Sequence, residues 1–282
     1  MKVVDVRDVF EQELQSLYEV NEIRQHFAAL CKVYFDYSPA EVVLNLQEAV
    51  SAADYTRFKN DLLQLKKHIP IQYIIGKVDF ASIRISVNRS VLIPRPETEE
   101  LVHWILTSFT KNEPIQLLDI GTGSGCIALA LKKNRPNWHI SGWDIDTNSL
   151  QVARQNAKDN DLQVDFYQVD VLSKILPQKK WDLIVSNPPY VPEVFKKTTQ
   201  PHVLEQEPMH AIFVPDNNPL CFYERICDYA VQQLNPSGKL FFEGHAPLMN
   251  YLKTLLLKLG FSDIVLRNDY NTNPRFIRAT KQ

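Results

Sequence analysis

A strand, a glycine-rich turn and a helix follow one another over residues 115–133, and this order most restricts the folds open to the chain. Residues 115–120 form a short apolar run typical of a buried strand, and Gly121-Thr-Gly-Ser-Gly125 then leads into a predicted helix over residues 126–133. Glycines let the backbone approach a ligand closely, and a helix N-terminus favours negative charge. The GxGxG spacing fits the dinucleotide fingerprint imperfectly, but the pattern predicts a parallel α/β sheet with a ligand at the strand end.

Two more apolar runs end in acidic residues. Residues 139–143 are predicted to form a strand that stops at Asp144, and residues 164–169 a strand that stops at Asp170. A carboxylate at the tip of the second strand can accept hydrogen bonds from both hydroxyls of a ribose, and Asp170 is a candidate partner for an adenine amine. Because the carboxyl ends of parallel strands lie at one edge of a sheet, we expect these side chains to border the same crevice.

A fourth apolar run, residues 183–185, is followed by Asn187-Pro188-Pro189-Tyr190. Each proline favours extended geometry in the residue before it, and neither proline has an N–H to donate. The turn therefore presents carbonyl oxygens, one amide side chain and one aromatic ring, a set that suits a planar NH2 group. Acceptors on its two hydrogens would stabilise the positive charge that develops on nitrogen during alkylation. The alternative is a proline-rich loop that merely ends a strand.

The bulk properties narrow the class of protein. The 282 residues are 45% hydrophobic and 23% charged with a net charge of −2, as in an ordinary globular protein. Near-neutral charge argues against a polynucleotide substrate, because nucleic-acid binders usually have a basic surface. The four cysteines are scattered, and no Cys/His spacing indicates a metal or a disulfide framework. The charged N-terminus does not match a signal peptide, and no uncharged run reaches the roughly 20 residues of a membrane span, so we expect a cytoplasmic protein.

The first quarter of the chain shows helical periodicity and predicts three to five short helices over residues 8–69. Ser38-Pro39-Ala40-Glu41 has the form of a capping box, and Asp54 is expected to cap a further helix. Residues 78–87 then alternate apolar and polar side chains, which predicts a β-hairpin. Residues 91–100 hold two prolines around Arg95, and their composition favours a rigid linker.

The glycine turn, the two acidic strand ends and the Asn-Pro-Pro-Tyr turn, in this order, resemble a class I S-adenosylmethionine-dependent amino-methyltransferase. Four segments extend the resemblance to the HemK/PrmC family over nearly the whole chain: residues 71–76, 91–102, 118–128 and 184–191. Members of that family methylate the side-chain amide nitrogen of glutamine in the Gly-Gly-Gln motif of class 1 peptide chain release factors. In the family the segment at 91–100 borders the active site, which replaces the linker interpretation.

The resemblance implies an α/β fold: a class I methyltransferase with a doubly wound, mostly parallel sheet, an N-terminal helical bundle and a β-hairpin connector. We expect residues 1–72 to form the bundle and to recognise the release factor, residues 73–95 to form the connector, and residues 96–282 to form the methyltransferase domain. The expected partner is a class 1 release factor. No membrane, metal or direct nucleic-acid contact is expected, and the protein is expected to be a monomer.

The same resemblance implies S-adenosylmethionine as the cofactor and assigns roles along the crevice. The glycine turn would surround its methionine part, Asp144 would hold the ribose, and Asp170 would lie beside the adenine. The full set expected around the cofactor is Gly121, Thr122, Gly123, Ser124, Gly125, Asp144, Ile145, Asp170, Val171 and Asn187.

The substrate site implied by the resemblance is the turn Asn187-Pro188-Pro189-Tyr190, with Asn187, Pro188 and Tyr190 as the catalytic residues. Asn187 and the Pro188 carbonyl would bind the glutamine amide, and Tyr190 would pack on its plane. No general base is evident, so the amide proton is expected to leave to water after the methyl group has moved.

Two other activities stay open at this point. One is glutamine methylation of a ribosomal protein; the other is N-methylation of adenine or guanine in nucleic acid, because the same tetrapeptide also binds exocyclic amines. Base flipping would need a basic groove for the strand. The chain also departs from the family pattern, with no glycine in residues 213–220 and Glu243-Gly-His245 at a late strand end, so the conformation of residues 191–220 is left open.

Overall fold

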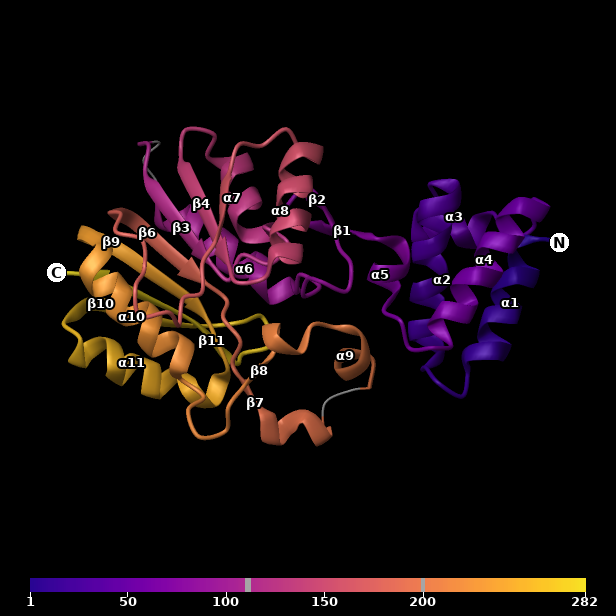
Figure 1. Cartoon of the computed structure of the whole chain (residues 1–282). Helices are drawn as coiled ribbons and strands as arrows, with labels where there is room; N and C mark the ends of the chain where they lie inside the picture. Colours follow the sequence, from indigo (N-terminus) through magenta and orange to yellow (C-terminus); the bar gives the residue numbers. More distant parts are fainter. Residues whose placement is uncertain (110–112, 199–200) are drawn as a thin grey trace. The chain divides into compact units, whose positions relative to one another are not determined.

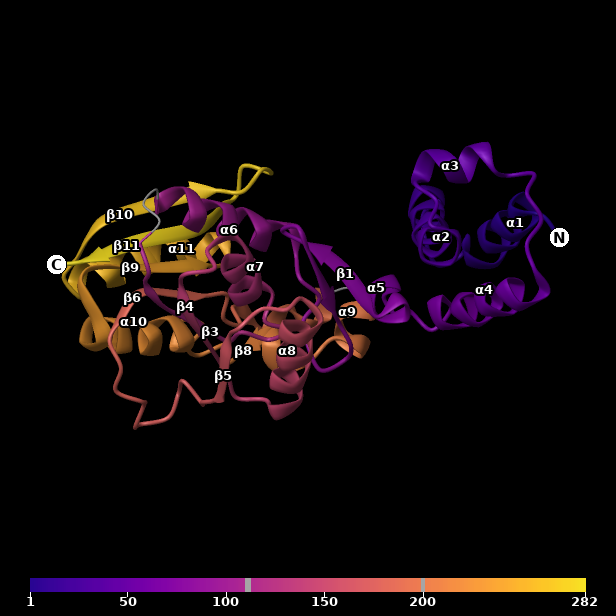
Figure 2. The same ribbon diagram turned by 90° about the horizontal axis from the view of Figure 1, so that it is seen from above.

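The computed structural model describes residues 1–109, 113–198 and 201–282. The chain separates into two units, each with an apolar core of its own. The first holds Met1–Gly76 and the short helix α9 (Pro201–Gln206), and the second holds the rest of the chain from Lys77 onward. Figure 1 labels the elements of both units, and Figure 2 shows them from above.

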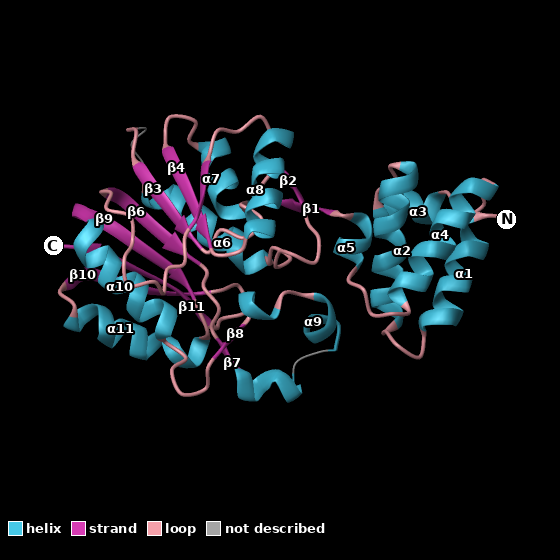
Figure 3. Ribbon diagram, viewed as in Figure 1, coloured by secondary structure: helices cyan, strands magenta, loops and turns pink. Residues whose placement is uncertain are grey.

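Helices make up the first unit, as the colouring by secondary structure shows (Figure 3). Those before the hairpin are α1 (Val3–Leu14), α2 (Val20–Phe35), α3 (Pro39–Leu44), α4 (Ala52–Leu65) and α5 (Ile71–Ile75). Their centre is aromatic: the ring of Phe10 lies 5.5 Å from that of Phe27 and 6.0 Å from that of Phe58. All three rings are fully buried. Replacing one buried phenylalanine of such a cluster by alanine typically lowers the free energy of unfolding by about 3–5 kcal/mol.

Side-chain caps set where two of these helices begin. Ser38 accepts from the Glu41 amide, and the Glu41 carboxylate accepts from the Ser38 amide at 2.8 Å, so α3 has the predicted capping box. The expectation for Asp54 is wrong, because Ser51 caps α4 and accepts from the Asp54 amide at 3.0 Å. The Asp54 carboxylate instead accepts from the Ser51 hydroxyl at 2.7 Å, one turn inside the helix.

The second unit is built on a seven-stranded sheet in the order β10-β11-β9-β6-β3-β4-β5. The five strands from β9 to β5 are parallel, and β11 and β10 add an antiparallel edge. The predicted α/β class with a mostly parallel sheet is thereby confirmed. The strands are β3 (Gln116–Ile120), β4 (His139–Asp144), β5 (Asp165–Gln168), β6 (Trp181–Ser186), β9 (Leu234–Glu243), β10 (Phe261–Asn268) and β11 (Pro274–Lys281).

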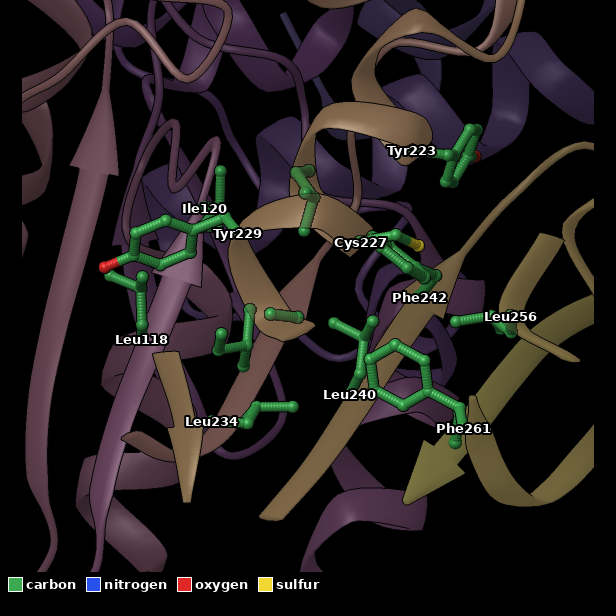
Figure 4. Packing of buried hydrophobic residues seen from close by; sticks show 14 of the residues in the cluster. Leu118, Ile120, Tyr223, Cys227, Tyr229, Leu234, Leu240, Phe242, Leu256 and Phe261 are labelled. Atoms are coloured by element: carbon green, nitrogen blue, oxygen red, sulfur yellow. The ribbon is translucent and has the colours of Figure 1, made fainter. Parts of the chain in front are cut away.

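Helices cover both faces of this sheet, which makes it doubly wound (Figures 1 and 2). One layer holds α6 (Pro96–Ser108), α7 (Cys126–Asn134) and α8 (Thr147–Asp159), and the other holds α10 (Cys221–Gln233) and α11 (Met249–Lys258). Strand side chains alternate between the two layers. Leu118 and Ile120 join the core beneath α10 and α11 with Leu240 and Phe242 (Figure 4), whereas Phe241 faces the other way and packs edge-on against Trp104 of α6.

The predicted hairpin is present as β1 (Lys77–Phe80) and β2 (Ile83–Ser86), and it is fastened to α8 through one side chain. Asn156 accepts from the Ser86 amide at 2.7 Å and donates to the Ser86 carbonyl at 3.0 Å. A shorter pair, β7 (Val191–Pro192) and β8 (Phe213–Val214), lies beyond the Asn-Pro-Pro-Tyr turn. None of the helices in the described ranges combines the length and the apolar character that crossing a membrane demands.

Candidate active site

The site lies where the strand order reverses. The chain runs outward from β3 through β4 to β5 and then returns to place β6 on the other side of β3, and open α/β sheets bind ligands at this point. Ile120, the last residue of β3, pairs with Ser186, the last residue of β6, and the Ser186 hydroxyl donates to the Ile120 carbonyl at 2.7 Å. The glycine turn and the Asn187 turn therefore start side by side.

A cavity of about 280 Å³ opens above these two strand ends. It combines backbone of the glycine turn with two acidic side chains and the first part of the proline turn. The predicted site residues that line it are Gly121, Gly123, Asp144, Ile145, Asp170, Val171, Asn187, Pro188 and Pro189.

The glycine turn divides into residues that face the cavity and residues that support the loop. Gly121 and Gly123 line the cavity with φ of 72° and 55°, values that L side chains rarely adopt. Thr122 and Ser124 are buried, and the Thr122 hydroxyl donates to the Asp119 carboxylate at 2.6 Å. Gly125, with φ of 79°, caps α7. The last three therefore hold the shape of the loop and are not among the residues that line the cavity.

Asp144 at the tip of β4 is fixed by backbone donors. Its carboxylate accepts from the Gly123 amide at 2.8 Å and from the Asp146 amide at 3.0 Å. Burial nevertheless raises the pKa of Asp144, because removing the carboxylate from water disfavours its charged form. Donors from ribose hydroxyls would stabilise that charge. Asp170 lies in the same cavity and accepts from the Leu172 amide at 2.9 Å.

The proline turn presents two different surfaces. Asn187 and both prolines line the cavity, and the Asn187 amide nitrogen donates to the Thr98 hydroxyl at 3.3 Å. Tyr190 instead stacks on His245, with ring centroids 6.1 Å apart and planes 14° apart. Burial and the nearby Glu243 carboxylate raise the pKa of Tyr190 to about 12, so its hydroxyl is neutral at physiological pH.

Several site residues were not predicted. Thr98 and Glu243 reach Asn187 from α6 and β9, and His210 enters the cavity near Asp144 and Asp146 from a short 3-10 turn (Met209–Ala211). The segment that carries His210 is anchored by Glu207, whose buried carboxylate accepts from Arg95 at 2.6 Å. Thr98 and Arg95 lie in the Pro-Arg-Pro-Glu-Thr-Glu segment, which the family resemblance places at the border of the active site.

The lining of this cavity fits an adenosyl group. The carboxylates of Asp144 and Asp170 can accept hydrogen bonds from the hydroxyl groups of a ribose and the amine of an adenine. The apolar side chains of Ile145 and Val171 also line the cavity, and the glycine backbone lets a ligand approach closely. A seven-stranded sheet with this strand order and this crevice defines a class I S-adenosylmethionine-dependent methyltransferase.

Comparison with known proteins narrows that class. Residues 102–267 match the family model for the methyltransferase small domain, and residues 5–76 match that for the PrmC N-terminal domain. The release factor glutamine methyltransferase of Flavobacterium psychrophilum is 37% identical over 282 residues, covering 99% of both chains. That of Bacteroides thetaiotaomicron is 40% identical over 233 residues, covering 82% of this chain and 83% of the relative. The chain belongs to the release factor glutamine methyltransferase family.

Solved structures agree at the level of the fold. A methyltransferase from Pyrococcus furiosus has a TM-score of 0.53 at 19% identity, over 79% of this chain and 98% of that chain. The hMettl16 catalytic domain in complex with MAT2A 3'UTR hairpin 6 has a TM-score of 0.57 at 17% identity, over 82% of this chain and 83% of that chain. At these identities the likeness shows a shared fold alone.

Proposed function

We propose that this protein transfers the methyl group of S-adenosylmethionine to the side-chain amide nitrogen (N5) of the glutamine in the Gly-Gly-Gln motif of class 1 peptide chain release factors. One observation carries the proposal: Asn187, Pro188 and Pro189 line the same cavity as the glycine turn and Asp144. Hydrogen-bond acceptors for an amide therefore stand beside the cofactor crevice. Membership of the release factor glutamine methyltransferase family supplies the substrate class.

The residues of the turn would act by binding and positioning the amide. The Asn187 side-chain oxygen and the Pro188 carbonyl would each accept one hydrogen of the glutamine NH2 group, which orients the nitrogen and raises its electron density. The sulfonium of the bound cofactor supplies the methyl group and a good leaving group. Asn187 and Pro188 would then stabilise the positive charge that develops on the nitrogen, and its proton would leave to water.

Tyr190 would contribute an aromatic surface for the glutamine side chain. Its stacking on His245 limits how the ring can turn, and its pKa of about 12 keeps the phenol from acting as a base near neutral pH. The rate would thus come from orientation and from preorganised acceptors.

We also propose a separate role for each of three segments of the chain. Residues 1–72 would recognise the release factor, residues 73–95 would connect, and residues 96–282 would bind the cofactor and carry out transfer. The first unit has an apolar core of its own, which supports a separate recognition role. We further propose that the protein acts in the cytoplasm as a monomer and without direct nucleic-acid contact, in keeping with a net charge of −2.

Mass spectrometry tests the activity directly. Purified class 1 release factor is incubated with the protein and S-adenosylmethionine, and the peptide with Gly-Gly-Gln is examined for one added methyl group on glutamine. A release factor in which that glutamine is replaced by glutamate is the matched control and should gain no methyl group. Modification of ribosomal protein or of RNA, with no modification of the release factor, would contradict the proposal.

A further inference from the structure

Three side chains from distant parts of the chain form one hydrogen-bonded row behind the proline turn. Asn187 follows β6, Thr98 stands in the first turn of α6, and Glu243 ends β9. The Asn187 amide nitrogen lies 3.3 Å from the Thr98 hydroxyl, which lies 2.8 Å from the Glu243 carboxylate. Thr98 is 3% exposed and Glu243 1%, so the contact between these two side chains is shielded from bulk water.

The chemistry of the row fixes its direction. Burial raises the pKa of Glu243 to about 7. Above that pH its carboxylate can only accept, so the single hydroxyl hydrogen of Thr98 is donated to Glu243 at 2.8 Å. The lone pairs that remain on Thr98 can only accept, and Asn187 must therefore turn its NH2 group toward Thr98. Burial raises the pKa of Glu243, and the hydrogen bonds from Thr98 and from the Asn187 amide oppose that rise because they stabilise the ionised carboxylate.

The NH2 group of the planar Asn187 amide is therefore bound to the row, and its oxygen is not. With the NH2 group held against Thr98 and Glu243, the oxygen is on the opposite edge, and Asn187 borders the cavity. While Glu243 is ionised, the reverse orientation would set the Asn187 oxygen against the acceptors of the row and its NH2 group against an incoming NH2 group. Both contacts would lose a hydrogen bond and leave polar groups without partners.

We propose that Thr98 and Glu243 are positioning residues that hold the amide of Asn187 in the one orientation that offers its oxygen to the acceptor nitrogen. Neither residue touches the substrate; both act through Asn187. The identity of the acceptor as a glutamine amide rests on the proposed function, whereas the orientation of Asn187 rests on the hydrogen-bonded row alone.

The matched variants are Thr98→Val, which keeps the shape and removes the hydroxyl, and Thr98→Ser, which keeps the hydroxyl. Loss of one preorganised electrostatic contact typically costs two to three orders of magnitude, and an indirect effect should be smaller, so we expect kcat to fall roughly 10- to 100-fold in Thr98→Val. The Kd for S-adenosylmethionine, measured by calorimetry, should stay within about threefold of wild type, and kcat of Thr98→Ser should stay within about fivefold. Equal kcat in wild type and Thr98→Val, or an equal loss in both variants, would overturn the proposal.

A second measurement separates this proposal from the proposed function. The side-chain NH2 resonances of Asn187, identified by their loss in Asn187→Asp, report its hydrogen bonds without any methyl acceptor present. They should shift and exchange with solvent faster in Thr98→Val and remain close to wild type in Thr98→Ser. Unmoved resonances in Thr98→Val would refute the proposed orientation, whatever the release factor assay shows. Failure of wild type to methylate the release factor, with the expected shifts present, would refute only the proposed function.

Discussion

Replacement of Asn187 by alanine is the most direct test of how this site works. The change removes one of two proposed acceptors for the substrate NH2 group and leaves the Pro188 carbonyl in place. Losing one preorganised hydrogen-bond partner of a developing charge costs about 2.7–4 kcal/mol, which corresponds to about 10²- to 10³-fold in kcat.

The structure also indicates what Asn187→Ala should leave intact. Asp144, Asp170 and the glycine turn keep their places in the cavity, so the affinity for the cofactor should change only a few-fold. Thr98 loses one donor, but its own bond to Glu243 at 2.8 Å persists, so the stability should fall by only about 1 kcal/mol.

The assay combines single-turnover methyl transfer with calorimetry of cofactor binding. Asn250→Ala is a suitable control, because Asn250 is an exposed residue of α11 and the same side-chain change there should leave both measurements as in wild type. If Asn187→Ala turned over within threefold of wild type, Asn187 would not be the acceptor proposed here. A loss of cofactor affinity as large as the loss of rate would instead place Asn187 in cofactor binding.

Three further predictions concern other parts of the site. Asp144→Ala should weaken S-adenosylmethionine binding about 10- to 100-fold, because hydrogen bonds to a charged group contribute about 1.5–3 kcal/mol, and calorimetry showing no loss would contradict the ribose assignment. Tyr190→Phe retains the stack on His245 and should keep kcat/KM within about threefold of wild type. Tyr190→Ala should lower kcat/KM by up to about tenfold, because the aromatic surface is lost. Equal kcat/KM for the two variants in steady-state assays would exclude an aromatic role. Burial raises the pKa of Glu243 from 4.5 to about 7, so below pH 7 the folded chain holds a proton on Glu243 more tightly than the unfolded chain does. The stability that this proton contributes is complete below pH 4.5 and is lost as the pH rises through 7. Urea unfolding of the full chain should therefore show a free energy of unfolding that declines between pH 5 and pH 8. If Glu243→Gln shows as steep a decline as wild type, groups other than Glu243 cause it.

Local sequence was sufficient for the parts of the site that follow directly on a strand. At Gly121, Asp144 and Asn187 an apolar run is broken by a residue with distinct chemistry, and parallel strands bring such ends to one edge. Local sequence was ambiguous where two residues have the same capability, as with Ser51 and Asp54, both of which are good helix caps.

The row behind Asn187 was decided by tertiary structure alone. Thr98 is 89 residues from Asn187 and 145 residues from Glu243 along the chain. No periodicity links such positions, because their contact depends on how α6 packs against the far ends of β6 and β9. The sequence therefore predicted Asn187 as the acceptor residue, whereas the packing of α6 against the sheet brings Thr98 and Glu243 together beside it, because these positions are distant along the chain.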